Sequence, residues 1–342
     1  MQKVESKANR TSRPLLTLVV LTFALCAFSW YLVFGMAATA RKDSAAGMQL
    51  GTQGDKPGQF QQPRGITGFP DGTFFVVDRS ARMQLFAADG TPMKLWSMKE
   101  HDLGNPKGVT ALPDGNLLVC DTHYGRVLKM SVDGKMIKQW GGPGRGPSEF
   151  THPLSAAVDR ARKIVYVVEY GDRNDRVQAF DLDGNHLKSW GSFGTEPGTF
   201  QRPSGIALDA GGNIFVADAC NHRIQKFDPD GTLISVFGAM GYAAGELRYP
   251  YDIACGPDGL LYVAEFNGHR ISVFDGEGQF VRFFGGAGSR PGEFANPWSL
   301  AVDARGRLLV SDTGNNRIQI FDLPRRENTT LAAKSGASLV KQ

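Results

Sequence analysis

The stretch Pro203–Gly231, PSGIALDAGGNIFVADACNHRIQKFDPDG, is the clearest copy of a unit that the chain repeats. Two short runs, Ile206–Asp209 and Asn213–Asp218, are separated by a Gly-Gly turn, and a third run, Arg223–Asp228, follows a polar loop. Short runs rich in Val, Ile and Phe, bounded by Gly, Asp and Pro, are typical of β-strands joined by tight turns. The unit therefore predicts a small sheet of consecutive strands.

Six segments of the chain align on three residues of this unit. A Pro precedes the first run, an acidic residue closes the second, and an Arg opens the third. The prolines are Pro63, Pro106, Pro153, Pro203, Pro250 and Pro297. The acid–Arg pairs are Asp78 with Arg82, Asp121 with Arg126, Glu169 with Arg176, Asp218 with Arg223, Glu265 with Arg270, and Asp312 with Arg317. Self-similarity at 43 to 50 residues indicates a solenoid, a propeller or another repeat array.

A fourth run completes most copies, as in Leu233–Phe237 and Phe280–Phe284. Six copies of four strands predict an all-β fold, a six-bladed β-propeller over residues 46–322. The sixth copy has no fourth run, because the chain turns polar after its third. We expect residues 46–51 to supply that outer strand, which closes the ring and removes an exposed edge. Residues 323–342 are expected to form a flexible tail.

The N-terminal region has a different character. Residues 15–37 are uncharged and apolar, and supply the roughly 20 residues that a membrane-spanning helix needs. More positive charge precedes this segment than follows it, which places residues 1–14 in the cytoplasm and the propeller outside, in the periplasm or the extracellular space. Ala38-Thr39-Ala40 also fits a signal-peptide cleavage site, and cleavage there makes the protein secreted. A single-pass anchor and a cleaved signal are both compatible with this segment.

Composition sets further bounds. The chain has 342 residues with 42 Gly and 18 Pro, which is typical of a fold with many tight turns. A net charge of +4 permits anionic partners without requiring them. Outside the apolar segment the cysteines are Cys120, Cys220 and Cys255, an odd number at irregular spacing. We therefore expect neither a disulfide framework nor a CxxC metal site.

The repeats resemble NHL repeats. The resemblance is carried by NHRIQKFD at 221–228, by NNRIQIFD at 315–322, and by the Pro-Gly-x-Phe-x-x-Pro-x-Gly-Ile lead-ins at 57–66 and 197–206. It covers residues 46–322 and implies the propeller fold. Members of this family include RNA-binding domains, extracellular sensor domains and an amidating lyase, so the resemblance implies no single activity.

Candidate site residues lie where the blades differ from one another. In a propeller, the starts of the inner strands and the loops between second and third strands share one face. The residues directly after the repeat prolines are Arg64, Lys107, Leu154, Ser204, Tyr251 and Trp298. Four of these, Arg64, Lys107, Tyr251 and Trp298, depart from the repeat and predict a pocket that is basic at blades one and two and aromatic at blades five and six. Asp252 lies one position further along, two residues after its repeat proline, and is the one acid at that position in the six blades. It could orient a cationic or hydroxyl group.

Loop residues on the same face add Tyr124, Tyr170 and Arg173, the last two in the longest such loop. The repeated acid and Arg flank one loop in every blade, so we interpret those pairs as structural ion pairs. His222 and His269 occupy a regular repeat position and are interpreted as turn residues. No catalytic residue is predicted.

Three functional classes can be compared. In the amidating lyase of this family, metal-binding His follows the repeat Pro. None of the six positions here is His, and His152 lies one residue before Pro153. The sequence favours a membrane-tethered propeller that binds a protein, peptide, glycan or anionic small molecule. The alternative is an enzyme of lyase or lactonase type with a metal at the channel mouth; no cofactor is otherwise predicted. Nucleic-acid binding is disfavoured because the propeller is expected outside the cytoplasm.

Overall fold

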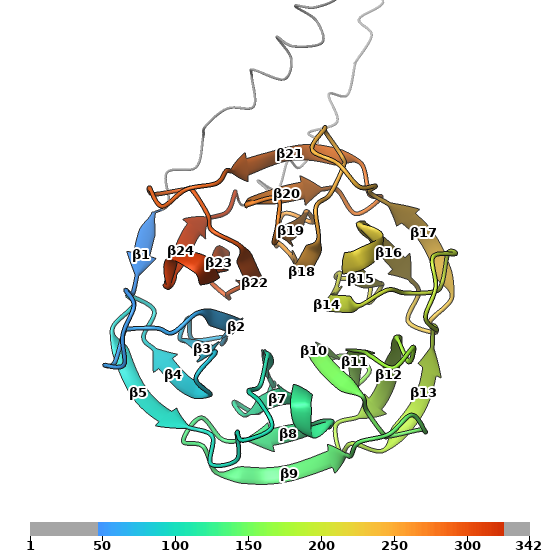
Figure 1. The fold of residues 1–342 in the computed structure, drawn as a ribbon, viewed down its shortest axis with the longest axis horizontal. Helices are drawn as coiled ribbons and strands as arrows, with labels where there is room; N and C mark the ends of the chain where they lie inside the picture. Colours follow the sequence, from blue (N-terminus) through green and yellow to red (C-terminus); the bar gives the residue numbers. More distant parts are fainter. Residues whose placement is uncertain (1–46, 325–342) are drawn as a thin grey trace, which may run out of the picture. The chain divides into compact units, whose positions relative to one another are not determined.

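The computed structural model describes residues 47–324, which form six four-stranded antiparallel sheets around a central axis (Figure 1). Each sheet is one blade, and the strands run from the axis outward in chain order in five of the six. The all-β, six-bladed propeller predicted from the repeat is confirmed. In Figure 1 the inner strands surround the central opening and the outer strands form the rim.

The first three blades follow directly in sequence. Blade one contains β2 (Pro63–Gly68), β3 (Phe74–Asp78), β4 (Arg82–Phe86) and β5 (Pro92–Ser97). Blade two contains β6 (Gly108–Ala111), β7 (Leu117–Asp121), β8 (Arg126–Met130) and β9 (Met136–Gly141). Blade three contains β10 (His152–Asp159), β11 (Ile164–Tyr170), β12 (Arg176–Asp181) and β13 (His186–Trp190).

The last three blades repeat the pattern. Blade four contains β14 (Pro203–Leu208), β15 (Ile214–Asp218), β16 (Arg223–Phe227) and β17 (Leu233–Phe237). Blade five contains β18 (Pro250–Cys255), β19 (Leu261–Glu265), β20 (Arg270–Phe274) and β21 (Phe280–Gly285). Blade six contains β22 (Pro297–Val302), β23 (Arg307–Asp312), β24 (Arg317–Asp322) and, from the start of the domain, β1 (Met48–Leu50).

Ring closure depends on β1. It pairs antiparallel with β24, with Met48 opposite Ile320 and Leu50 opposite Ile318. The repeat pattern assigns this outer position of blade six to residues 46–51. In the structure the strand comprises three of those residues. The pairing joins the two ends of the domain and leaves the third strand of blade six without a free edge. Leu323 is also buried and its N–H donates to Gly306 O, so the folded domain includes one residue of the predicted tail.

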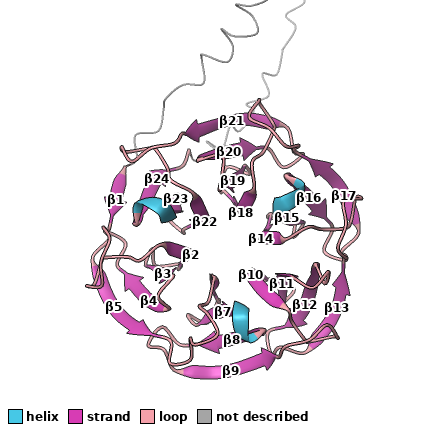
Figure 2. Ribbon diagram, in the orientation of Figure 1, coloured by secondary structure: helices cyan, strands magenta, loops and turns pink. Residues whose placement is uncertain are grey.

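Short 3₁₀ helices follow the second strand in blades two, four and six (Figure 2). They are η1 (Thr122–Tyr124), η2 (Ala219–Asn221) and η3 (Thr313–Asn315). Each ends at a residue in the left-handed region, with φ of 59° at Gly125, 56° at His222 and 53° at Asn316. His222 is therefore a turn residue, and its Nδ1 accepts the Tyr249 N–H at 3.1 Å.

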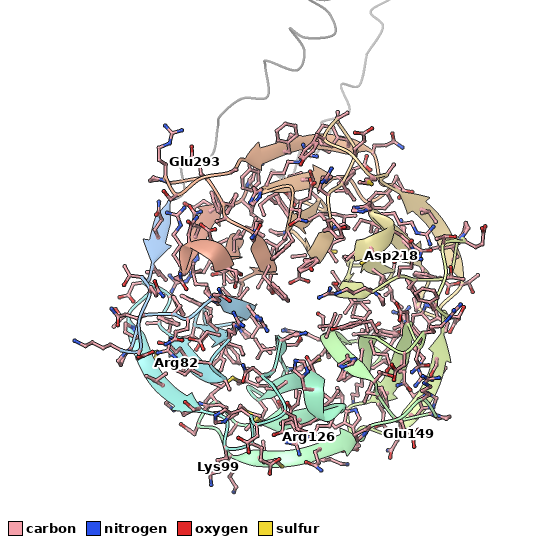
Figure 3. All side chains as sticks on the ribbon, viewed as in Figure 1. Arg82, Lys99, Arg126, Glu149, Asp218 and Glu293 are labelled. Atoms are coloured by element: carbon pink, nitrogen blue, oxygen red, sulfur yellow. The ribbon has the colours of Figure 1, made fainter. Side chains whose placement is uncertain are left out.

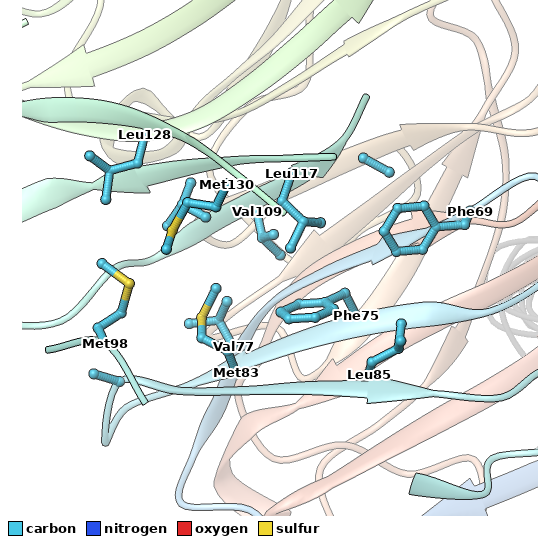
Figure 4. Packing of buried hydrophobic residues seen from close by; sticks show 13 residues of the cluster. Phe69, Phe75, Val77, Met83, Leu85, Met98, Val109, Leu117, Leu128 and Met130 are labelled. Carbon is cyan, nitrogen blue, oxygen red and sulfur yellow. The ribbon is translucent and has the colours of Figure 1, made fainter. Parts of the chain in front are cut away.

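The hydrophobic core lies between blades. Six clusters of buried side chains each join two neighbouring blades around the ring. Figure 4 shows the cluster between blades one and two, where Phe75 and Met83 face Leu117 and Met130. Each blade thus buries both faces of its middle strands, which explains why Phe74–Asp78 is apolar at every position before its closing acid.

The acid–Arg pairs predicted to be structural form ion pairs in all six blades, with closest N–O distances of 2.5–2.8 Å. Figure 3 labels three of these residues, Arg82, Arg126 and Asp218, in three different blades. In five blades the Arg also donates to backbone carbonyls of the loop that leads into the blade, as Arg223 does to Glu196 O and Thr199 O. The pairs therefore fasten the connections between blades, and burial makes them costly to break.

Some predicted features lie outside the described residues. They are the cytoplasmic segment 1–14, the apolar segment 15–37, the Ala38-Thr39-Ala40 sequence and the tail from 325 onward. Within residues 47–324, no helix is long and apolar enough to span a bilayer. The three cysteines in that range, Cys120, Cys220 and Cys255, are free thiols.

Candidate functional site

Six side chains meet around one mouth of the central channel, one for each blade. We call them the mouth ring: Arg64, Lys107, Tyr170, Arg202, Tyr251 and Trp298. Five of them stand at or just before the start of an inner strand, and Tyr170 ends β11, whose pairing with β10 brings it to the same face. The propeller's symmetry thus gathers residues that are far apart in sequence.

Successive members of the mouth ring contact each other. The Arg64 guanidinium lies 4.8 Å from the Trp298 ring centroid, and Trp298 meets Tyr251 edge-on at 4.9 Å. Arg202 lies over both Tyr251 and Tyr170, at 5.5 and 5.1 Å. Lys107 Nζ lies 5.8 Å from the Tyr170 centroid and 3.5 Å from its hydroxyl. Phe266 stacks on Tyr251, with ring centroids 4.5 Å apart.

The circuit closes between Lys107 and Arg64 through adjacent backbones. A Cβ at Gly65 would lie 2.7 Å from the Lys107 carbonyl oxygen, so β2 approaches the start of blade two more closely than a side chain permits. This explains the glycine that follows Arg64 in the sequence. The Arg64 side chain is consequently close enough to contribute to lowering the pKa of Lys107, after burial.

The three cations of the mouth ring form no ion pair with a carboxylate in the part of the chain that the structure describes. Within residues 47–324, no salt bridge is formed by Arg64, Lys107 or Arg202. The Nε atoms of Arg64 and Arg202 are buried and lack a hydrogen-bond acceptor in the same range. Asp175 is the acid next to Arg202, and its carboxylate accepts the backbone N–H of that residue at 2.6 Å. No carboxylate in the described part of the chain therefore forms an ion pair with the cations of the mouth ring.

The electrostatic consequence is visible in the pKa values. Burial, then Arg64 and Arg202, lower the pKa of Lys107 from 10.5 to about 8. Burial and the neighbouring Arg79 and Arg202 lower the pKa of Arg64. Burial, Lys107 and His152 lower the pKa of His123, which lies beside the ring and meets His152 edge-on at 5.9 Å. Each group binds its proton less tightly because burial removes water from its charged form and, to a smaller extent, because other cations lie nearby.

The channel continues beneath the mouth ring. Gly108, Asp252 and Ser299, which each follow a ring residue, line a cavity of about 250 Å³. Leu208, Cys255 and Val302 line both this cavity and an open depression of about 840 Å³ at the other end, beside Arg305. The inner strands thus enclose a channel whose two ends differ, since the mouth ring occupies only one of them.

Asp252 lies in the channel wall, below the ring. Its carboxylate accepts the Ser299 hydroxyl at 2.6 Å and the backbone N–H groups of Leu300 and Ile253 at 2.9 Å. Burial raises the pKa of Asp252 to about 6. The hydroxyl that Asp252 orients therefore belongs to the neighbouring blade, and the structure gives this residue a role in joining blades five and six.

The structure brings together five of the predicted site residues, namely Arg64, Lys107, Tyr170, Tyr251 and Trp298. Two others lie away from the mouth ring. Tyr124 packs under Arg126 at 4.7 Å, and its hydroxyl accepts the Leu103 N–H. Arg173 is exposed and covers Phe193 at 4.9 Å.

Sequence reasoning missed Arg202 as a site residue. It occupies the position before the repeat Pro, where Gln62, Tyr249 and Asn296 stand in other blades. All four residues have a positive φ between 50° and 55°, a conformation that L residues adopt rarely. The signal that could have found it is a cation at a position where the other blades carry neutral side chains. With Arg202 included, basic and aromatic residues interleave around the ring and do not occupy separate halves.

A metal site needs converging ligands. Among residues 47–324 no group of three or more His, Cys, Asp and Glu side chains comes together as such a site requires. His123 and His152 are neighbours, but no carboxylate or thiol joins them.

Known structures share this fold at low sequence identity. Virginiamycin B lyase from Staphylococcus aureus is 18% identical with a TM-score of 0.55, covering 81% of this chain and 88% of that one. A gluconolactonase from Xanthomonas campestris is 16% identical with a TM-score of 0.58, covering 78% and 87%. A chain of the nidogen/laminin complex is 17% identical with a TM-score of 0.51, covering 65% and 79%. These likenesses show the fold alone.

Sequence comparison identifies the repeats themselves. No curated protein matches the chain. The NHL repeat family matches residues 200–227, 247–274 and 294–321, which span much of blades four, five and six. The protein is therefore a six-bladed β-propeller that contains NHL repeats.

Proposed function

We propose that the protein is a binding module that takes a small anionic ligand at the mouth ring. The observation that carries the proposal is the trio of Arg64, Lys107 and Arg202, which converge on one channel mouth without a carboxylate partner among residues 47–324. An anion placed there receives charge-assisted hydrogen bonds, which are about twice as strong as neutral ones.

The aromatic members of the mouth ring support the same function. Tyr170, Tyr251 and Trp298 hold the cations in place through their ring faces. They fix the guanidinium groups without neutralising them, so the positive charge stays available to a ligand. A site prepared in this way loses less conformational entropy when a ligand binds.

The proposal includes the location of the propeller. The apolar segment 15–37, flanked by Lys and Arg, supports a membrane tether with the propeller outside the cytoplasm. In that location a periplasmic or extracellular anion is the ligand, and nucleic acid is not. Protease added outside sealed spheroplasts should cleave the propeller, and protection that is lost only when the cytoplasmic membrane is ruptured would contradict this part of the proposal.

The alternative is an enzyme of lyase or lactonase type with a metal ion at the channel mouth. One structural neighbour is named a lyase and another a gluconolactonase. Metal analysis of the purified full chain tests it, since a resident zinc or calcium ion would be present at one equivalent. That result would replace the anion-binding proposal with a metal site whose ligands lie elsewhere than in the mouth ring.

The test of anion binding uses the full-length chain and calorimetric titration with acetate and with inorganic phosphate. We expect one binding site per chain. The double variant Arg64→Gln/Arg202→Gln should weaken binding by about tenfold or more for each guanidinium removed, because a hydrogen bond to a charged group contributes about 1.5–3 kcal/mol. Carboxylate and phosphate titrations distinguish the two classes of anion.

The matched control is Arg305→Gln, which removes an exposed cation beside the opposite end of the channel. It should leave affinity unchanged. Equal losses in both variants would mean that net charge, and not the mouth ring, attracts the anion. Absence of any saturable anion binding would overturn the proposed function.

A further inference from the structure

Lys107 differs from the other buried lysine that the structure describes. Lys107 and Lys226 are 8% and 5% exposed. Lys226 Nζ donates to Gly276 O at 2.8 Å and lies 3.4 Å from Glu277 Oε1, so its charge is compensated. Lys107 Nζ has one hydrogen-bond contact, the Tyr170 hydroxyl at 3.5 Å, and no carboxylate within residues 47–324. A buried amine with a hydroxyl for a partner is better accommodated neutral than charged.

Charged neighbours act in the same direction. Arg64 faces Lys107 from β2, Arg202 from the start of blade four, and His123 from η1, while Tyr170 is the hydroxyl on β11. The pKa of Lys107 is lowered to about 8, which leaves about one amine in ten neutral at pH 7. Desolvation beside another cation is the environment that makes a lysine nucleophilic.

Resting on the proposed anion site, the geometry points to a covalent function: the Lys107 amine condenses reversibly with the carbonyl of a small 2-oxo acid whose carboxylate is held by Arg64 and Arg202. The three cations then have distinct roles. Arg64 and Arg202 bind the carboxylate of the ligand, and Lys107 attacks its carbonyl carbon. Lys107 Nζ and the Arg202 guanidinium lie 5.8 and 5.1 Å from the centroid of the same Tyr170 ring, so a small molecule beside that ring is the ligand whose size suits both groups.

The chemistry balances without a redox partner. The neutral amine forms a C–N bond to the carbonyl carbon and gives a carbinolamine. The carbinolamine oxygen then takes a proton and leaves as water. As the C–O bond breaks, the nitrogen lone pair forms the C=N bond of a protonated imine. Tyr170, whose hydroxyl adjoins Nζ, is positioned to donate that proton and to recover it in the reverse step. Water re-enters to release the carbonyl compound.

The experiment traps the imine on the full-length chain with pyruvate and sodium cyanoborohydride, followed by peptide mass mapping. We expect the reduced adduct on the Lys107 peptide at a level at least tenfold above that on Lys226. Acetone, a ketone with a methyl group where pyruvate has its carboxylate, is the matched probe. Arg64→Gln/Arg202→Gln should reduce the pyruvate adduct about a hundredfold relative to the acetone adduct when pyruvate is below saturation, because two charged donors are lost.

Variants at the nucleophile complete the design. Lys107→Arg should remove the adduct, and Lys226→Arg should leave it unchanged. Because either variant could disturb folding, the pH dependence of reductive methylation by formaldehyde is measured on the unaltered chain. The Lys107 rate should rise with a midpoint near pH 8.

The outcomes separate this inference from the proposed function. Anion binding with no adduct on Lys107, or with adducts spread over lysines according to their exposure, would overturn the covalent role and leave the binding role intact. Absence of saturable acetate and phosphate binding would overturn both. A Lys107 methylation midpoint near that of an ordinary lysine would also contradict the inference, whatever the variants do.

Discussion

Arginine serves two opposite purposes in this propeller, in the blade loops and at the channel mouth. Arg223 in blade four is surrounded by acceptors, including Asp218 Oδ2 at 2.8 Å and three loop carbonyls. Arg202, in the loop that leads into the same blade, rests on two tyrosine rings and has no ion pair within the described residues. The Arg223 guanidinium is therefore supplied with acceptors and a counter-ion, whereas the Arg202 guanidinium is held in position by aromatic rings without an ion pair in the described residues.

The difference shows which charges belong to the fold. The acid–Arg pairs recur in all six blades because each blade needs its loop fastened. The mouth ring has a different residue at nearly every blade, so blade geometry does not require it. A cation held by aromatic faces and left without a counter-ion is the pattern expected of a ligand site, since structural charges are paired when they are buried.

The largest expected effect comes from breaking a loop pair. Asp218→Asn removes the charge from a carboxylate that is fully buried and accepts from Arg223, Asn221 and Gln201. We expect a loss of about 3–5 kcal/mol in the free energy of unfolding, because the largely buried Arg223 guanidinium loses its counter-ion. Urea unfolding measures it. Asp230→Asn, at an exposed residue paired with Lys188, should cost less than about 1 kcal/mol. Similar losses in the two variants would contradict the structural role of the pair.

The next effect concerns Lys107 and pH. Its pKa is about 8 in the folded chain and near 10.5 in the unfolded chain, so between these values the unfolded chain holds more protons. The free energy of unfolding therefore rises with pH through this window, and the cost of charging Lys107 is fully present below pH 8.

Lys107→Met should be more stable than the unaltered chain at pH 7 by up to about 3 kcal/mol, and the gain should vanish above pH 10.5. Urea unfolding of both proteins at pH 7 and pH 10.5 checks the sign. A stability difference that is constant with pH would contradict it.

Ligand binding should show the matching trend. An anion at the mouth ring gains from the charge of Lys107, so its affinity is expected to fall as pH rises through about 8. Titration of acetate at pH 7 and pH 9 measures this change. Lys107→Met should abolish the dependence.

A smaller effect on stability is expected at Arg64. Arg64→Gln removes the cation–π contact with Trp298, which stabilises the folded chain. It also removes the repulsion between Arg64 and the other cations near it, which destabilises the folded chain. The two contributions oppose each other, so the free energy of unfolding should stay within about 1 kcal/mol of the unaltered protein. Anion affinity should nevertheless fall about tenfold, because a charged donor is lost. A large loss of stability without loss of affinity would reverse the distinction between ring and loop arginines.

Much of the fold follows from the sequence because a propeller is specified one blade at a time. The repeat prolines, acids and arginines mark strand ends, and the missing fourth run in blade six indicates where β1 must pair. The site is harder to derive, because it depends on which side chains the closed ring brings together. Arg202 shows the limit: its position before Pro203 places it at the mouth only through a positive φ, which sequence patterns do not reveal.

The sequence was also unable to separate Tyr124 and Arg173 from the ring residues. Both follow second strands on the predicted face, yet Tyr124 packs under Arg126 and Arg173 turns outward over Phe193. Loop residues can reach several directions from one position, whereas inner-strand residues are fixed by the strand. Positions at strand starts were therefore the more reliable candidates.

Blade two sharpens the comparison with the smallest expected effect. Arg126 pairs with the buried Asp121, as in other blades, but its second partner is the exposed carboxylate of Glu100 and no loop carbonyl. Glu100→Gln should cost no more than about 0.5–1 kcal/mol, and the cost should disappear in high salt, because an exposed ion pair is screened. Urea unfolding at low and high ionic strength measures it. If Glu100→Gln instead cost as much as Asp218→Asn, the fastening of blade loops would depend on total charge around the Arg and not on burial, and the distinction between loop and mouth arginines would lose its physical basis.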